Sequence, residues 1–145
     1  MQKINDILAV FSKANSNYHS ASFYRFSKLS ENPNEDIEAA FRTNPDVKPH
    51  DRVDTTLLKN WRQELFTKYP DNERSWLHAE IDGYPSKGKA GKDYIIDLIL
   101  ETLGSLPTDV YYVEVDPYGY YACSDEEYIF KTNGGLYLYS MQIHD

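Results

Sequence analysis

Residues 108–145 read TDVYYVEVDPYGYYACSDEEYIFKTNGGLYLYSMQIHD, and this stretch decides the fold. Tyrosine, valine and isoleucine, which favour strands, gather here in short runs separated by residues typical of turns. In the first run Tyr111 and Val113 alternate with Tyr112 and Glu114, which is the period of a strand with two different faces. The stretch predicts four strands, at residues 110–116, 120–124, 127–131 and 136–143.

Short connections join these predicted strands. The first is Pro-Tyr-Gly at residues 117–119, and the second is Ser-Asp-Glu at residues 124–126. The third is Asn133-Gly134, the dipeptide most typical of a two-residue type I′ hairpin turn. Because connections this short can join only antiparallel neighbours, the sequence predicts an antiparallel β-meander.

The chain before residue 108 has mainly helical periodicity. Ile4, Ile7, Leu8 and Phe11 share one face of a helix, and three later segments show similar spacing. Helices are predicted at residues 4–14, 35–42, 54–68 and 94–103, and strands at residues 22–28 and 75–82. Mostly helices followed by strands indicate one α+β domain over residues 1–145. We expect an antiparallel sheet of about four C-terminal strands, one or two further strands from the N-terminal part, and about four helices packed on one face.

The composition indicates which stabilising cross-links the chain can form and in which cellular compartment we expect it. With 145 residues, 41% of them hydrophobic, the chain can bury a core without disulfides. Cys123 is the only cysteine, so the chain can form neither an internal disulfide nor a zinc site with paired cysteines. Asn5 and Asp6 interrupt the apolar N-terminal positions, unlike in a signal peptide, and no apolar run reaches the ~18 residues of a membrane span. We therefore expect a cytoplasmic protein.

Charge and tyrosine are both concentrated at the C-terminal end. The whole chain has a net charge of −8, and residues 108–145 carry seven acidic residues against one lysine, Lys131. The same stretch holds eight of the thirteen tyrosines. An acidic surface disfavours contact with nucleic-acid phosphates and anionic membranes, and it favours a basic protein partner. Tyrosine is enriched at the energetic centres of protein interfaces.

These features predict a partner-binding surface on the meander. Tyr112, Glu114 and Asp116 share one face of the first predicted strand, and the other candidates lie at the predicted turns. The predicted partner-binding residues are Tyr112, Glu114, Asp116, Tyr118, Tyr120, Asp125, Glu126 and Glu127. The alternative interpretation is that the tyrosines serve the core and the acidic turns serve solubility.

A second hypothesis is a small metal-dependent enzyme resembling a nuclease. His78, Glu80 and Asp82 share one face of the predicted strand 75–82, as metal ligands could. A polar strand face is more commonly just solvated, and the acidic chain offers little to hold a phosphate backbone. We therefore expect no enzyme, with no catalytic residue, resident metal or cofactor.

Residues 83–90 match the frame G-x-x-x-x-G-K of a phosphate-binding loop. The position after the lysine should be serine or threonine, whose hydroxyl holds magnesium, but it is Ala90. Pro85 also removes a backbone N–H that such a loop would use. We interpret this stretch, with Lys87, Lys89 and Lys92 nearby, as a basic connection rather than a nucleotide site.

In size, acidity and its tyrosine-carboxylate patch, the chain resembles bacterial immunity proteins, the antidotes of secreted toxins such as colicins and contact-dependent inhibition effectors. Antidotes of DNase colicins place adjacent tyrosines among acids at the contact, and Tyr111-Tyr112 with Glu114 and Asp116 is similar. Those antidotes are helical bundles, so no residue role is transferred to this α+β chain. The resemblance implies stoichiometric binding that covers the active or substrate-binding surface of a basic toxin domain. A phage-encoded acidic inhibitor is a further alternative.

Overall fold

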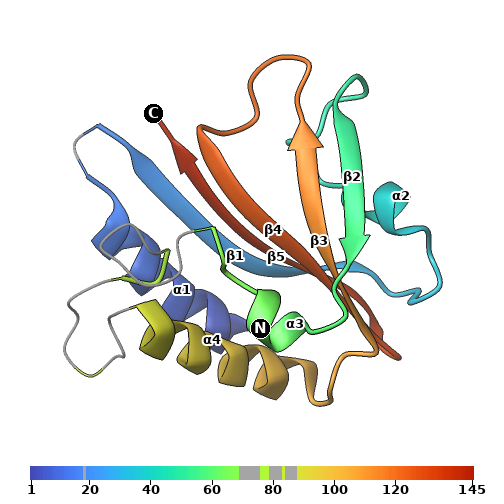
Figure 1. Ribbon diagram of the computed structural model, residues 1–145, viewed down its shortest axis with the longest axis horizontal. Helices are drawn as coiled ribbons and strands as arrows, with labels where there is room; N and C mark the ends of the chain where they lie inside the picture. The colour runs from blue at the N-terminus through green and yellow to red at the C-terminus, as the bar shows by residue number, and fades with distance from the viewer. Residues whose placement is uncertain (18, 69–75, 79–82, 84–87) are drawn as a thin grey trace.

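Residues 108–145 form three long strands in the computed structural model, β3 (Asp109–Asp116), β4 (Ser124–Thr132) and β5 (Gly135–His144). Two strands from earlier in the chain extend this meander at its edges: β1 (Ala21–Ser30) pairs with β5, and β2 (Arg52–Leu57) pairs with β3. The sheet is antiparallel throughout, in the order β1-β5-β4-β3-β2 (Figure 1). The predicted α+β class is confirmed. The structure describes residues 1–17, 19–68, 76–78, 83 and 88–145.

The meander differs from its prediction at residues 120–126. We expected a strand at 120–124 and a turn at 124–126, but residues 117–123 connect β3 to β4, and β4 runs without a break from Ser124. Ser124, opposite Ile143, begins the pairing of β4 with β5. The acidic Asp-Glu-Glu run suggested a solvated turn, whereas hydrogen bonds from the Trp76 and Tyr121 side chains allow Glu126 and Glu127 to be buried within the strand.

The hairpin between β4 and β5 lies where the sequence predicts it, at Asn133-Gly134, with Thr132 opposite Gly135. The predicted type I′ turn is wrong, because neither Asn133 nor Gly134 has the positive φ that this turn requires. The positive φ, 142°, is at Gly135 instead. A Cβ atom at Gly135 would lie 2.2 Å from the Ser30 carbonyl oxygen, so glycine is needed for the close approach of β1.

A helix is absent from most of residues 54–68, where the sequence predicts one. Residues 52–57 form the edge strand β2, and only the four residues of α3 (Trp61–Glu64) are helical in this segment. Pairing with β3 supplies hydrogen bonds that no local pattern encodes, so tertiary contact overrides the helical spacing. The strand predicted at 22–28 is confirmed as β1, which is longer at both ends.

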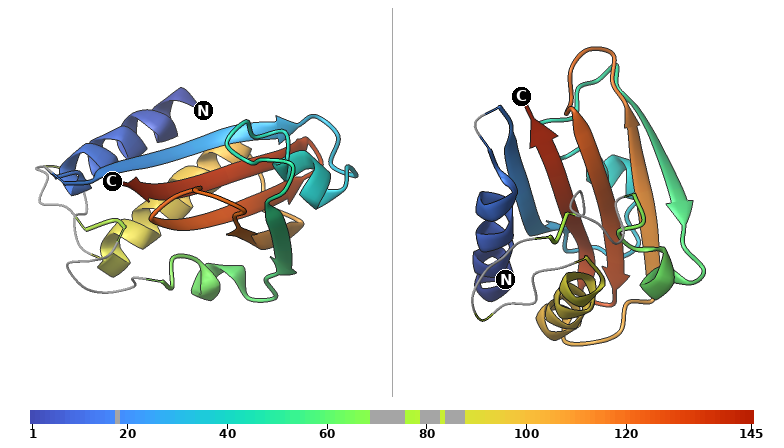
Figure 2. Two further views of the ribbon diagram at one scale, coloured as in Figure 1. Left: turned by 90° about the horizontal axis from the view of Figure 1, so that it is seen from above. Right: turned by 60° about the vertical axis from the view of Figure 1, so that its left-hand side comes forward.

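Three helices cover one face of the sheet, which we call the helix face. They are α1 (Gln2–Asn15), α3 and α4 (Gly88–Leu103), and the first and last contact each other directly (Figure 2). The short α2 (Ile37–Phe41) packs on the opposite face. We expected about four helices on one face. Three of them, α1, α3 and α4, lie on the helix face, and α2 lies on the opposite face.

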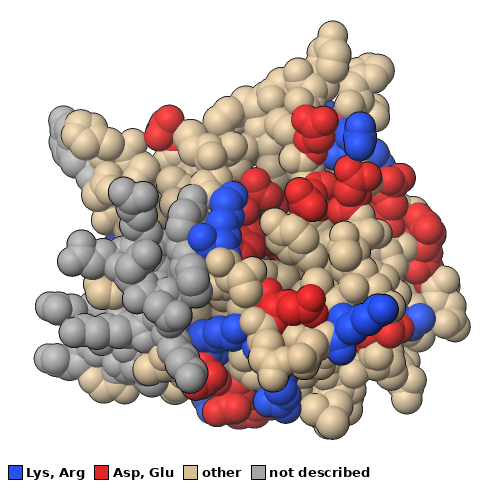
Figure 3. Space-filling model, viewed as in Figure 1, with Lys and Arg blue, Asp and Glu red and all other residues tan. Residues whose placement is uncertain are grey.

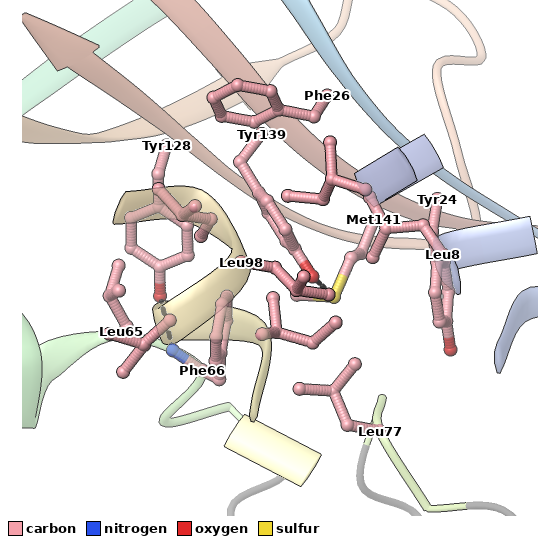
Figure 4. Packing of buried hydrophobic residues seen from close by; sticks show 14 of the residues in the cluster. Leu8, Tyr24, Phe26, Leu65, Phe66, Leu77, Leu98, Tyr128, Tyr139 and Met141 are labelled. Atoms are coloured by element: carbon pink, nitrogen blue, oxygen red, sulfur yellow. Dashed lines mark hydrogen bonds between the residues drawn. The ribbon is translucent and has the colours of Figure 1, made fainter. Parts of the chain in front are cut away.

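The main core lies between the helix face and α1 and α4. Tyr128, Tyr139 and Met141 point from the central strands into this core, where they meet residues such as Leu8 and Leu98 (Figure 4). Burying each large apolar side chain stabilises the fold by about 2 kcal/mol. Several C-terminal tyrosines are thus core residues, which the alternative interpretation of the sequence anticipated.

Leu65, Phe66, Trp76 and Leu77 belong to this core, which they contact through aromatic packing and hydrogen bonds. Phe66 has a positive φ of 58°, an uncommon backbone conformation for a residue with a side chain. The Phe66 backbone N–H donates to the Tyr128 hydroxyl at 2.9 Å, and its ring lies 5.1 Å from the Tyr139 ring (Figure 4). Trp76 and Leu77 form a turn and are both buried. The strand predicted at 75–82 is therefore not formed at residues 76–78, and its other residues lie outside the described part of the chain.

A second, smaller core lies on the opposite face. Ala40 and Phe41 of α2 are fully buried there against Val113 and Leu138 of the sheet. The side chain of Asp36 caps α2 by accepting a hydrogen bond from the Ala39 N–H. Both faces of the central strands are therefore covered over much of their length. None of the helices that the structure describes is long and apolar enough to cross a membrane.

Candidate functional site

An acidic strip runs along the helix face at the β2 edge of the sheet. Asp54 of β2 lies directly opposite Glu114 of β3, and Asp116 lies two residue pairs further along on the same face, opposite Arg52. The side chains of Glu114 and Asp116 form no ion pair with any residue that the structure describes. Asp54 has one, with the Arg52 Nε atom 3.3 Å from its Oδ2 atom. Acidic side chains gather over β2 and β3 in Figure 3.

The pairing of Asp54 with Glu114 is unfavourable for the sheet by itself. Like charges directly opposite each other on neighbouring strands destabilise an antiparallel pair. Arg52 offsets part of this repulsion, but its contact with Asp54 is solvent-exposed and so contributes little, on the order of 0–1 kcal/mol. A positively charged group placed over the strip would remove the remaining repulsion.

A groove of about 570 Å³ adjoins the strip. Tyr112 and Tyr128 form its sheet side, with ring centroids 5.4 Å apart, and residues 63–68 form its other side. The groove is lined by Leu58, Gln63, Glu64, Thr67, Lys68, Tyr112, Glu114, Glu126 and Tyr128. Burial, followed by the charges of Glu126 and Glu114, raises the pKa of Tyr112 to about 12. The Tyr112 hydroxyl therefore stays protonated at neutral pH and can donate a hydrogen bond.

Glu126 lies at the inner end of this groove and is buried, so its predicted place on an exposed partner-binding turn is wrong. Its Oε1 atom accepts hydrogen bonds from the Trp76 indole N–H at 3.0 Å and the Lys68 backbone N–H at 3.2 Å. Its Oε2 atom accepts one from the Tyr128 hydroxyl at 2.5 Å. These three donors allow a carboxylate to be buried, and two of them join Lys68 and Trp76 to β4.

Glu127 points to the opposite face and is also buried, so the same correction applies to it. Its Oε1 atom accepts a hydrogen bond from the Tyr121 hydroxyl at 2.6 Å, while its Oε2 atom has no hydrogen-bond partner among the described residues. Burial raises the pKa of Glu127 to about 7, and the negative charge of Asp125 adds to the shift. Glu127 is a buried acid that is hydrogen-bonded to Tyr121 of the loop 117–123, and it is not among the residues that line the groove.

The other predicted partner-binding residues lie at different places. Asp125 is half-buried, and burial raises its pKa while the positive charge of Lys68 lowers it. Tyr118 and Tyr120 are exposed on the loop 117–123, away from the groove lining. The Tyr118 ring packs against His50, with centroids 5.6 Å apart. The structure thus places Tyr112, Glu114 and Asp116 on one face of β3, whereas Tyr118 and Tyr120 lie on the loop 117–123 and are not among the residues that line the groove.

The alternative metal site is predicted at His78, Glu80 and Asp82. His78 follows the turn at residues 76–77, and Glu80 and Asp82 lie outside the described residues. Within the described part of the chain, no group of three or more acidic, histidine or cysteine side chains could hold a metal ion. Lys87 of the basic connection is also outside the described residues, whereas the Lys92 ammonium donates to the Gln63 carbonyl at 3.2 Å.

Sequence reasoning missed the part of the site that residues 52–68 supply. Asp54, Glu64 and Lys68 fall in a segment predicted as one helix, which hid their place beside β3. The alternation of Val53, Thr55 and Leu57 with polar residues is a weak strand signal that the helical spacing of later residues outweighed.

Comparison with known proteins found no matching family model, no matching curated protein and no matching solved structure.

Proposed function

We propose that this protein is a stoichiometric inhibitor that binds a basic protein partner through the acidic strip and its adjoining groove. In this proposal it is an immunity protein that neutralises a cognate bacterial toxin domain by covering the toxin's active or substrate-binding surface. The observation that carries the proposal is the pairing of Asp54 with Glu114 beside Tyr112, because this arrangement costs stability unless a cation comes to it.

Three further features support a protein partner over a small molecule. The strip is exposed and open, so that a broad surface can approach it. Tyr112 and Tyr128 give the groove an aromatic floor, and the half-buried Tyr112 can contribute both contact area and a hydrogen bond. Glu64, Glu114 and Glu126 line the groove against one lysine, Lys68, so its potential is negative. Toxins that act on nucleic acids carry basic surfaces for phosphates, and these would complement this charge.

The proposal is tested by capture from a lysate of the native host, with the protein immobilised and the retained proteins identified. We expect a basic protein retained in a one-to-one complex. Reversing two charges of the strip, Glu114→Lys with Asp116→Lys, should slow association about tenfold or more at low salt and change dissociation less, because exposed charges act mainly on the encounter.

The matched control is Asp6→Lys with Asp97→Lys, which makes the same change in net charge on the exposed sides of α1 and α4. This control should leave the association rate close to that of the unaltered protein. Capture of no protein partner would contradict the proposal. An unchanged affinity of the strip variant at low salt would contradict the assignment of the surface.

A further inference from the structure

The two edge strands of the sheet, β1 and β2, differ in whether their outward-facing backbone groups are hydrogen-bonded. At the β1 edge, α1 supplies side chains to the outward-facing backbone groups. The Asn5 side chain accepts a hydrogen bond from the Phe26 N–H at 2.8 Å and donates one to the Phe26 carbonyl at 2.8 Å. The Ser16 hydroxyl accepts one from the Ser22 N–H at 3.0 Å. These contacts block the addition of another strand at β1, as protected edges usually do.

Among the residues that the structure describes, none protects the β2 edge in this way. The Leu58 N–H donates to the Val110 carbonyl at 2.9 Å, which fixes which β2 residues face β3. Because the direction alternates along an antiparallel strand, Asp54 and Thr56 direct their backbone groups to β3, and Val53, Thr55 and Leu57 direct theirs outward. The outward backbone groups of these three residues make no hydrogen bond to any residue that the structure describes.

The side chains beside this open edge have a defined pattern. Asp54 projects on the helix face, next to Glu114 of the acidic strip. Thr55 and Leu57 project on the opposite face, and the Leu57 side chain is 48% exposed, although leucine is normally buried. An added strand would therefore meet negative charge on one face and an apolar side chain on the other.

We propose that the partner adds an extended segment to the open edge of β2, with lysine or arginine on the helix face alternating with apolar residues on the opposite face. Main-chain hydrogen bonds to Val53, Thr55 and Leu57 would supply affinity, and the cations beside Asp54 and Glu114 would supply selectivity. A second copy of this chain is the wrong occupant, because pairing two β2 edges would bring two acidic strips together. The inference rests on the proposed function only in requiring a basic partner.

The test uses a defined probe, the acetylated and amidated peptide Lys-Val-Lys-Thr-Lys-Val, titrated into the isotopically labelled protein. Amide hydrogen exchange is followed by NMR. We expect the N–H groups of Val53, Thr55 and Leu57 to exchange at least about tenfold more slowly with saturating peptide. The N–H groups of Asp54 and Thr56, already bonded to β3, should change little. A peptide with glutamate in place of lysine should not bind.

Thr55→Pro removes one outward N–H and places a ring at the edge, yet it leaves the β3 ladder intact. It should weaken peptide binding about tenfold or more, whereas Thr55→Val, which keeps the N–H, should bind like the unaltered protein. If the proline variant does not fold, amide hydrogen exchange of the unaltered protein with the peptide still tests whether the three outward N–H groups are bound.

Several outcomes overturn the edge inference. They are absence of binding, binding without protection of the three outward N–H groups, equal binding of the glutamate peptide, and self-association of the protein through β2. Binding without protection would leave the acidic strip as a surface contacted by side chains alone, and the proposed function would stand. Conversely, host capture that retains no basic protein would remove the proposed function while the peptide result could still hold.

Discussion

Glu127→Gln should remove a large pH dependence from the stability of this protein. The Glu127 side chain is fully buried, its Oε1 atom accepts a hydrogen bond from the Tyr121 hydroxyl, and its Oε2 atom has no hydrogen-bond partner among the described residues. Burial raises its pKa from the ordinary 4.5 to about 7. Of the charges that face it, Asp125 raises this pKa and Arg25 lowers it. Glutamine keeps the shape of the side chain and cannot ionise.

The direction in which stability changes with pH follows from the number of protons bound by the folded and the unfolded chain. Between pH 4.5 and about 7 the folded chain holds a proton on Glu127 that the unfolded chain has already lost. Stability therefore falls as pH rises through this window and is lower by a constant amount above it. Each unit of pKa difference corresponds to about 1.4 kcal/mol, so a shift from 4.5 to about 7 lowers the free energy of unfolding by about 3 kcal/mol.

The assay is equilibrium unfolding in urea at several pH values from 4.5 to 8, with the unaltered protein and Glu127→Gln measured side by side. The difference between the two free energies cancels other titrating groups, and it should change by about 3 kcal/mol in favour of the variant as pH rises. Asp97→Asn removes the same charge from an exposed position on α4 and controls for net charge. Tyr121→Phe, which removes a hydrogen bond to the carboxylate, should extend the sloping region to higher pH. A difference that stays constant across the window would refute this account of Glu127.

Two further variants test how Trp76 and Leu77 pack against the rest of the protein, each by urea unfolding. Gly91→Ala would place a Cβ atom 2.7 Å from the Leu77 carbonyl oxygen, so it should destabilise the fold by about 1–3 kcal/mol. Gly119→Ala, where the added Cβ has no atom within 4 Å, should be nearly neutral, and equal effects of the two would contradict the close packing. Trp76→Phe leaves the buried Glu126 carboxylate without its indole donor and should cost about 2 kcal/mol, whereas a neutral result would mean that this hydrogen bond contributes nothing.

The site could be predicted where it depends on alternation within one strand. Tyr112, Glu114 and Asp116 lie on one face in the structure, as the period of two requires. Glu126 and Glu127 were misplaced because acidic residues are rarely buried without partners. Their partners are a tryptophan 50 residues away along the chain for Glu126 and a loop tyrosine for Glu127. No local pattern in the sequence places Trp76 beside Glu126.

The sequence determined that residues 108–145 form an antiparallel meander, with three strands where it predicts four, and it determined the class of the fold. Short connections between β-rich runs allow only antiparallel neighbours, and the spaced apolar residues of 4–14 form a helix that needs a sheet to pack on. Tertiary structure alone decided the two edges. Residues 52–57 became a strand because β3 offered them a hydrogen-bonding partner more than 50 residues away, and this pairing placed Asp54 opposite Glu114. Tertiary contacts also decided that outward backbone groups of β1 are hydrogen-bonded by Asn5, whereas those of Val53, Thr55 and Leu57 in β2 have no partner among the described residues. This difference depends on contacts between residues distant in the chain.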